Sequence, residues 1–272
     1  MLRPAHAVAV LLALAALLAG ACGRAAPPDP LTAVRGAVAQ TFADRTAQIA
    51  FTSRTGPPGT PGTEVTGTGV TDLVARSADV AVQAPLLGGG TRVLLVGGTL
   101  DVAVPPALAA LVPGGRPWVS VPLDRLTAAT LGGALPQFGG TPADPLSGVG
   151  ALQGITEARL VGPEPVDGTP ATRYATTVDL LATPAASDPA QRPAIDRLVA
   201  QIGSSRLPVD VWVGDDGRVR RVAQTVTAPD RPGRPATATA VTVTLSGHGL
   251  PVTIAPPPAD QVTDVSALLP AG

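Results

Sequence analysis

The chain of 272 residues has few of the side chains that most often carry out catalysis or bind metal ions. It contains one cysteine, Cys22, and two histidines, His6 and His248. Zinc sites are built mainly from several cysteine and histidine ligands, so we expect neither a metal site nor a cofactor. His248 lies in the sequence Ser-Gly-His-Gly, which favours a turn, and the Gly-x-Ser-x-Gly motif of many serine hydrolases does not occur. The sequence therefore predicts a protein that is not an enzyme and has no catalytic residues.

Lysine is absent, and aromatic residues are scarce. All 19 basic residues are arginines, the net charge is −1, and 14% of the residues are charged. Because nucleic-acid-binding domains usually carry a strongly basic surface, nucleic acid is not an expected partner. The six aromatic residues are scattered along the chain, whereas sites that stack bases gather several in one place. The run 88–90 (Gly-Gly-Gly) precedes a strand pattern and lacks the lysine of a phosphate-binding loop, so we interpret it as a turn.

The N-terminal 21 residues have the pattern of a secretory signal peptide. Arg3 precedes an apolar run over residues 7–18, which is too short to span a membrane comfortably, and small residues precede Cys22. The segment resembles the bacterial lipobox, in which the cysteine thiol receives a diacylglyceryl group. A chain with a single cysteine cannot form an internal disulfide bond, which also favours lipidation of Cys22. The alternative is an ordinary secretory signal followed by an unmodified cysteine.

These features predict a signal peptide (1–21), a lipidated tether (22–28) and one folded domain (29–272). Removal of the signal peptide leaves 272 − 21 = 251 residues, which is enough for a single hydrophobic core. Two acyl chains on the thiol and a third on the new N-terminus would anchor the protein durably. We therefore expect it on the extracytoplasmic face of the cell membrane, a short tether away from the lipid.

Two segments have the pattern of amphipathic helices. The first begins at Asp29, an N-cap residue followed by proline, and its apolar residues recur at helical spacing up to Phe42. The second begins at Asp188, carries Gln191 at the capping-box position and ends at Gly203. Its apolar stripe consists of Ile195, Leu198, Val199 and Ile202.

Most of the remaining chain has the alternating pattern of β-strands. The sequences at 97–98 (Gly-Gly) and 215–217 (Asp-Asp-Gly) predict tight hairpin turns. Short helices are predicted at 107–112, at 124–131 and from Asp144. We predict strands at 48–55, 64–74, 80–82, 92–96, 99–104, 118–121, 155–161, 169–179, 209–213, 219–222, 238–245 and 250–255. The expected fold class is α+β, with a sheet that is mostly antiparallel.

The order of these features resembles the actinobacterial LppX/LprA/LprF/LprG lipoproteins, which belong to the wider LolA-like fold. The resemblance covers nearly the whole mature chain in order. It rests on the lipobox, the first helix and the segments 118–121 (Trp-Val-Ser-Val), 144–146 (Asp-Pro-Leu), 157–162, 168–179 and 211–222.

The resemblance implies a single strongly curved antiparallel sheet, a half-barrel, with helices on its concave face and a hydrophobic cavity between them. Members of that family bind acylated lipids or glycolipids and carry or present them across the cell envelope. A membrane transporter is a possible partner. Apolar helix faces without aromatic side chains could accept acyl chains by burial of area alone. The candidate cavity-lining residues are Leu108, Leu111, Leu126, Leu131, Ile195, Leu198, Val199 and Ile202.

Two functions therefore remain open. The first is a lipid-anchored protein that binds an acylated lipid or glycolipid between its sheet and its helices. The second is a ligand-free structural or sensory lipoprotein that acts through protein contacts, in which case the same apolar faces form a filled core.

The densest basic cluster of the sequence consists of Arg218, Arg220 and Arg221. We interpret it as an exposed sheet edge, with contact to an anionic headgroup as the alternative.

Overall fold

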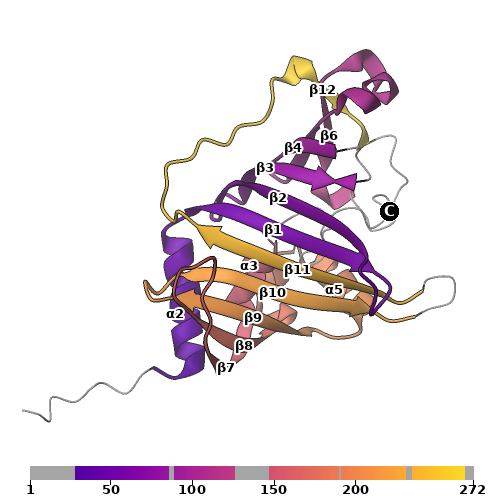
Figure 1. The fold of residues 1–272 in the computed structure, drawn as a ribbon. Helices are drawn as coiled ribbons and strands as arrows, with labels where there is room; N and C mark the ends of the chain where they lie inside the picture. The colour runs from indigo at the N-terminus through magenta and orange to yellow at the C-terminus, as the bar shows by residue number, and fades with distance from the viewer. Residues whose placement is uncertain (1–27, 86–88, 126–146, 190, 231–234, 267–272) are drawn as a thin grey trace, which may run out of the picture.

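The computed structural model describes residues 28–85, 89–125, 147–189, 191–230 and 235–266. These residues form one twelve-stranded sheet, in the order β12-β6-β5-β4-β3-β2-β1-β11-β10-β9-β8-β7 (Figure 1). The strands are β1 (Thr46–Gly56), β2 (Thr63–Asp72), β3 (Ser77–Ala84), β4 (Gly89–Val96), β5 (Thr99–Ala103), β6 (Trp118–Pro122), β7 (Ile155–Pro163), β8 (Ala171–Asp179), β9 (Arg206–Gly214), β10 (Val219–Ala228), β11 (Thr237–Ser246) and β12 (Val262–Asp264). The prediction of a single large sheet is confirmed.

Helices are few and mostly short. The α-helices are α2 (Pro30–Ala43), α3 (Ser147–Ala151), α4 (Pro184–Ser187) and α5 (Arg192–Ile202). The 3₁₀-helices are η2 (Pro106–Leu111), η3 (Pro113–Gly115), η4 (Leu123–Arg125), η5 (Leu152–Gly154), η6 (Leu180–Ala182) and η7 (Ala259–Gln261). In Figure 1, α3 and α5 lie behind β9 and β10, and α2 crosses the ends of the strands on the left. Within the described residues, no helix is long and apolar enough to cross a membrane.

Local sequence signals account for several element ends. The Asp29 carboxylate accepts hydrogen bonds from the backbone N–H groups of Leu31 and Thr32, which confirms the predicted start of α2. Gly203 ends α5 in the left-handed conformation that glycine adopts without steric cost (φ 78°). The predicted Gly97-Gly98 hairpin joins β4 to β5, with both glycines at positive φ, and the Asp-Asp-Gly turn joins β9 to β10.

Two predicted elements and the predicted strand direction are wrong in detail. The helix predicted from Asp188 begins only at Arg192, as α5. Gln191 takes the N-cap position, and residues 184–187 form the separate helix α4. Residues 250–255 form no strand. The last strand is instead β12, which lies parallel to β6, so the sheet is not entirely antiparallel. The predicted helices at 124–131 and from Asp144 extend into residues outside the described ranges.

Side chains of alternate strand positions gather on one face of the sheet, which we call the inner face. Pairing places Ile49 opposite Leu245 and Phe51 opposite Val243, and the inner face continues on β10 and β9 with Val222 and Val211. These side chains are buried in one cluster with residues of α2, α3 and α5. The helices therefore cover the inner face where it crosses β7–β10.

The ring of Phe51 occupies space that a glycine leaves free. Gly67 of β2 lies opposite Phe51 of β1. A Cβ atom at Gly67 would lie 2.6 Å from Phe51 Cζ and 2.9 Å from Val80 Cγ1. Since all three residues are buried, the core requires the absence of a side chain at Gly67.

We expect Gly67→Ala to lower the free energy of unfolding by about 2 kcal/mol, because an added methyl group overpacks a filled core. Denaturation by urea, followed by circular dichroism, measures the change. The matched control is Gly36→Ala in α2, where nothing lies within 4 Å of the added Cβ. The control should stabilise the protein by about 0.5–1 kcal/mol through higher helix propensity. Equal effects of the two substitutions would contradict the packing seen at Phe51.

Candidate functional site

The apolar stripe of α5 lies against the inner face, as its spacing predicts. Ile195 and Leu198 are buried, and Val199 and Ile202 are partly buried against the same cluster. The structure thus brings four of the candidate lining residues together. Their contact with a ligand stays a prediction.

Two further candidate residues belong to the 3₁₀-helix η2. Leu108 lies in η2 and is partly exposed, and Leu111 ends the same 3₁₀-helix. Leu126, Leu131 and the proposed lipidation site Cys22 lie outside the described residues.

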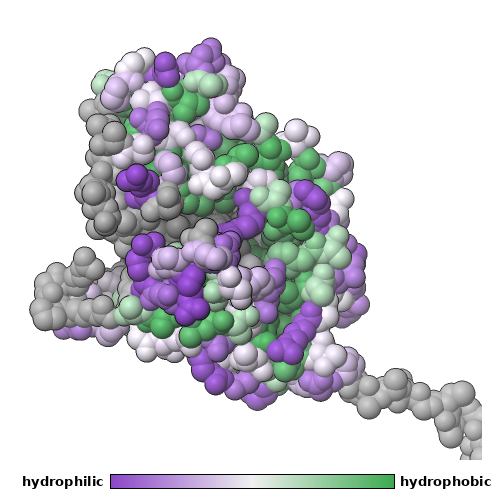
Figure 2. All heavy atoms as spheres, turned by 180° about the vertical axis from the view of Figure 1, so that it is seen from behind, coloured by the Kyte–Doolittle hydropathy of each residue, from purple (hydrophilic) through white to green (hydrophobic). Residues whose placement is uncertain are grey.

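The inner face stays apolar beyond the half that the helices cover. Leu100 of β5 and Val121 of β6 form a second buried cluster, against which Val102, Leu123 and Val265 pack. Val93 of β4 is partly exposed and packs against both clusters. The two clusters therefore form one continuous apolar surface from β9 to β6. In Figure 2, which shows the side on which α3 and α5 lie, hydrophobic patches extend across the middle of the molecule between hydrophilic side chains.

The strands supply most of this surface, whereas all of the predicted lining residues belong to predicted helices. The register puts the following apolar side chains on the inner face: Ile49, Phe51, Val65, Val80, Val82, Val93, Leu95, Leu100, Val102, Val119, Val121, Val178, Leu207, Val209, Val211, Val222, Val241, Val243 and Leu245. Strict alternation in runs such as 239–245 is the signal that could have identified them.

Within the described strands, the polar side chains that the register places on the inner face are uncharged. Ser53 and Thr239 are buried, and the Thr239 hydroxyl lies 3.1 Å from that of Thr55. The register places Gln224 in the same row as Ser53. The face can therefore bury aliphatic chains by the hydrophobic effect, and at this row it offers neutral hydrogen-bonding groups.

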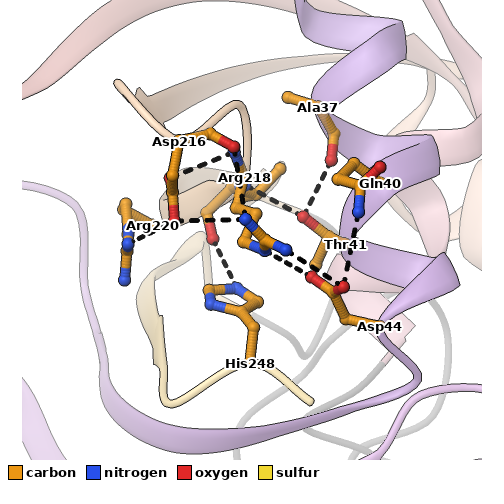
Figure 3. Close-up of polar contacts among 9 residues, drawn as sticks. Ala37, Gln40, Thr41, Asp44, Asp216, Arg218, Arg220 and His248 are labelled. Carbon is orange, nitrogen blue, oxygen red and sulfur yellow. Dashed lines mark hydrogen bonds and ion pairs between the residues drawn. The ribbon is translucent and has the colours of Figure 1, made fainter.

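A group of polar side chains fastens the C-terminal end of α2 to two turns of the sheet (Figure 3). We call this group the clasp, and it consists of Thr41, Asp44, Arg218 and His248. The Asp44 carboxylate accepts two hydrogen bonds from the Arg218 guanidinium, with Nε–Oδ2 at 2.5 Å and Nη2–Oδ1 at 3.2 Å. The clasp joins residues about 170 positions apart in the chain and fixes where α2 lies on the inner face.

The clasp also holds both backbone groups of Val219, next to the bulge at which β10 shifts register against β9. The Val219 N–H donates to the Thr41 hydroxyl at 2.9 Å, and that hydroxyl donates to the Ala37 carbonyl oxygen at 2.8 Å. The Nε2 atom of His248 lies 3.1 Å from the Val219 carbonyl oxygen, so the ring N–H donates there. Two side chains from outside the β9–β10 hairpin thus satisfy the backbone at the bulge.

The clasp sets the protonation of its members. The hydrogen bonds from Arg218 hold the pKa of Asp44 below its usual range, so this carboxylate is charged at neutral pH. Partial burial lowers the pKa of His248, and the nearby Arg220 guanidinium lowers it further. The imidazole is therefore neutral at pH 7 and acts as a structural hydrogen-bond donor, in agreement with the predicted turn.

The interpretation of the arginine cluster as an exposed sheet edge is wrong. Strand β10 lies inside the sheet between β9 and β11. Arg218 binds Asp44, Arg220 binds Asp216, and Arg221 binds Asp167. Each arginine thus has an acidic partner within the domain, which the sequence could not reveal because two of these partners are distant in the chain.

Comparison with known proteins gives matches among solved structures. No family model and no curated protein matches the chain. The chain is similar in structure to the LppX lipoprotein of Mycobacterium tuberculosis. That match has 16% sequence identity and a TM-score of 0.49, and it covers 85% of this chain and 100% of LppX.

Two further solved structures are similar. LprF from Mycobacterium bovis has 17% identity and a TM-score of 0.46, over 85% of this chain and 98% of LprF. A LolA superfamily protein from Nitrosomonas europaea has 13% identity and a TM-score of 0.36, over 81% of this chain and 94% of that protein. LppX and LprF belong to the group that the sequence resembles, so this group appears among the structural neighbours as well.

Thr41→Val tests the clasp. The substitution keeps the side-chain shape but leaves the buried Val219 N–H without its acceptor, so we expect the free energy of unfolding to fall by about 1–2 kcal/mol. Thr68→Val, at an exposed position of β2, is the matched control and should change it by less than about 0.5 kcal/mol. Urea denaturation at pH 7.5 compares the variants. If Thr41→Val leaves the free energy of unfolding unchanged, the Thr41 hydroxyl does not stabilise the bulge.

The lowered pKa of His248 predicts a pH dependence of stability. As pH falls, the unfolded chain takes up the proton first, near pH 6.5, so the folded state loses stability from that pH downward. The charged groups that face the ring are Asp44, Asp216 and Arg220. His248→Gln keeps an N–H donor but cannot titrate. The wild type should therefore lose more stability than this variant over that pH range in urea denaturation, and parallel curves would contradict the assignment.

Proposed function

We propose that this protein is a lipid-anchored protein of the cell envelope that binds an acylated lipid or glycolipid between its sheet and its helices. In this proposal the sheet curves into a half-barrel, α2 and α5 lie in its concavity, and the bound lipid is carried or presented outside the membrane. Cys22 carries the anchor, and no cofactor takes part. A membrane transporter that loads or unloads the lipid is the partner class that this role requires.

The observation that carries the proposal is the continuous, uncharged inner face. It runs from β9 to β6, and its side chains are mainly Val, Leu and Ile. Val93, Val102, Val199 and Ile202 are only partly buried, so apolar area is left at which an acyl chain could pack. Each methylene transferred from water contributes about 0.8 kcal/mol, so an acyl chain needs no charged partner to bind tightly.

The sequence of the N-terminus supports the anchor. An apolar run and small residues precede the only cysteine of the chain, and this cysteine has no possible disulfide partner within the chain. A protein that hands lipids to or from a membrane benefits from attachment to it, since the tether raises the local concentration of the domain at the surface.

Mass spectrometry of organic extracts tests the ligand. A Cys22→Ser protein, made with its signal peptide in an actinobacterial host, should yield a lipid in about 1:1 ratio to protein. Protein that is empty in repeated preparations would contradict lipid binding and favour the second function, a ligand-free lipoprotein that acts through protein contacts.

A bulky residue on the ligand side of α5 should reduce the amount of bound lipid. We expect Val199→Trp to lower lipid recovery at least about fivefold. Val199 of α5 is partly buried against the inner face, and an indole there would fill the space proposed for the lipid. Arg197→Trp places the same indole at an exposed position of the same helix and should leave recovery unchanged. Circular dichroism checks that both variants fold. Equal recovery from the two variants would place the lipid away from α5.

Cys22→Ser also tests the anchor. The wild-type protein should be recovered in the membrane fraction and should incorporate an alkyne analogue of palmitate, because acylation of one cysteine is the only proposed attachment. The variant should incorporate no label and should leave the membrane fraction. Labelling of the variant, or retention of it on the membrane, would contradict Cys22 as the anchor.

A further inference from the structure

The free edge of β7 exposes two large apolar side chains. Strand β7 ends the sheet on the side opposite to β12, so within the described part of the chain one of its edges has no neighbouring strand. Leu160 is 52% exposed and Val161 is 46% exposed, and they belong to the few large apolar side chains that are exposed in the described residues. They lie where the β7–β8 pairing shifts register, between Leu160 and Gly162.

Helix α2 begins close to this edge. Its N-terminal half packs against β7, and the Arg35 guanidinium donates to the Ile155 carbonyl oxygen with Nε–O at 3.1 Å and Nη2–O at 2.8 Å. The other end of α2 is held by Arg218 at the β9–β10 turn. In Figure 1, α2 accordingly extends from the bottom strand, β7, upward across the sheet. The start of the folded domain therefore lies at the β7 side.

The tether keeps this side near the membrane. The tether from the proposed lipidation site Cys22 to the residue before Asp29 has seven residues (22–28). A fully extended chain of this length spans at most about 25 Å, which is close to the length of α2 itself. Among the edges of the sheet, β7 is therefore the one that an anchor at Cys22 holds closest to the lipid.

The chemistry of the edge suits a lipid surface better than a further strand. Arg159 is exposed one position before Leu160, on the opposite face of the edge strand, and carries a positive charge that lipid phosphates attract, whereas Glu157 is already paired with Arg206. The register shifts near both ends of β7, together with Gly162 and Pro163, interrupt the regular ladder that a partner strand would extend. Isolated apolar side chains beside a cation can instead enter the headgroup region of a bilayer.

We propose that Leu160, Val161 and Arg159 form a contact surface through which the anchored domain rests on the outer surface of the bilayer. This inference rests on the proposed anchor at Cys22. Contact at β7 orients the sheet, so that the same side of the domain faces the membrane each time a lipid is taken up or released.

Hydrogen exchange on a chemically anchored protein tests this contact. Residues 22–272 have one cysteine, so a maleimide lipid in vesicles of phosphatidylcholine with about 20% phosphatidylglycerol can couple at Cys22 alone. The reference is the same protein coupled to water-soluble maleimide polyethylene glycol and mixed with the same vesicles. Mass spectrometry then compares exchange of the backbone amides in peptides that cover 155–163.

We expect exchange in β7 to slow at least about threefold on the vesicles, with no change in the β2–β3 turn. The double variant Leu160→Asp, Val161→Asp should lose this protection. The matched control is Val74→Asp in the β2–β3 turn, where the valine is 56% exposed, and this variant should retain the protection of β7. If the double variant unfolds, Leu160→Gln with Val161→Gln makes the same test with neutral side chains.

Two results would overturn the contact surface: equal exchange of β7 in the two coupled forms, or full protection in a folded double variant. These results are distinguishable from failure of the anchor. Chemical coupling does not depend on acylation in the cell, so β7 protection can be measured even if Cys22 is unmodified there. Conversely, an acylated Cys22 with an unprotected β7 would remove the contact surface and leave the anchor intact.

Discussion

The structure depends on the burial of one apolar face of one long sheet. The strands of the sheet present mainly Val, Leu and Ile on the inner face, and exposure of that face to water would cost about 25 cal/mol for each Å². Helices α2 and α5 cover the part at β7–β10, where Val34 and Ile195 join the cluster. The position of α2 in turn depends on the clasp, because Asp44 and Thr41 bind the β9–β10 hairpin at Arg218 and Val219.

The charged side chains of the described strands lie away from the inner face, and several of them pair with one another. The arginines of β10 and its preceding turn bind acidic partners at the end of the sheet or on its outer surface, as Arg218 does with Asp44 and Arg221 with Asp167. The inner face keeps only neutral polar groups such as Ser53 and Thr239. A surface of this kind does not require a charged ligand, and it supports a role in binding acyl chains rather than soluble anions.

Features that depend on neighbouring residues could be predicted from the sequence. Asp29 starts α2, Gly203 ends α5 and Asp-Asp-Gly turns β9 into β10, because each acts through its own backbone geometry or through hydrogen bonds to adjacent residues. Features that depend on residues far away in the sequence could not be predicted. The pairing of β12 with β6 joins residues about 144 positions apart, and three residues of alternating pattern do not specify a partner strand. The apolar surface was predicted only in part for the same reason: helical spacing placed Val199 on the apolar stripe of α5, whereas Val93 and Val102 reach the inner face through strand register.

A crystal structure of the Cys22→Ser protein, purified from an actinobacterial host with its lipids, would test the central claim most directly. The account predicts electron density for at least one acyl chain along the inner face, in contact with Val199 of α5 and with Val93 of β4. A core in which the protein's own side chains fill the whole space between α5 and the sheet would contradict it.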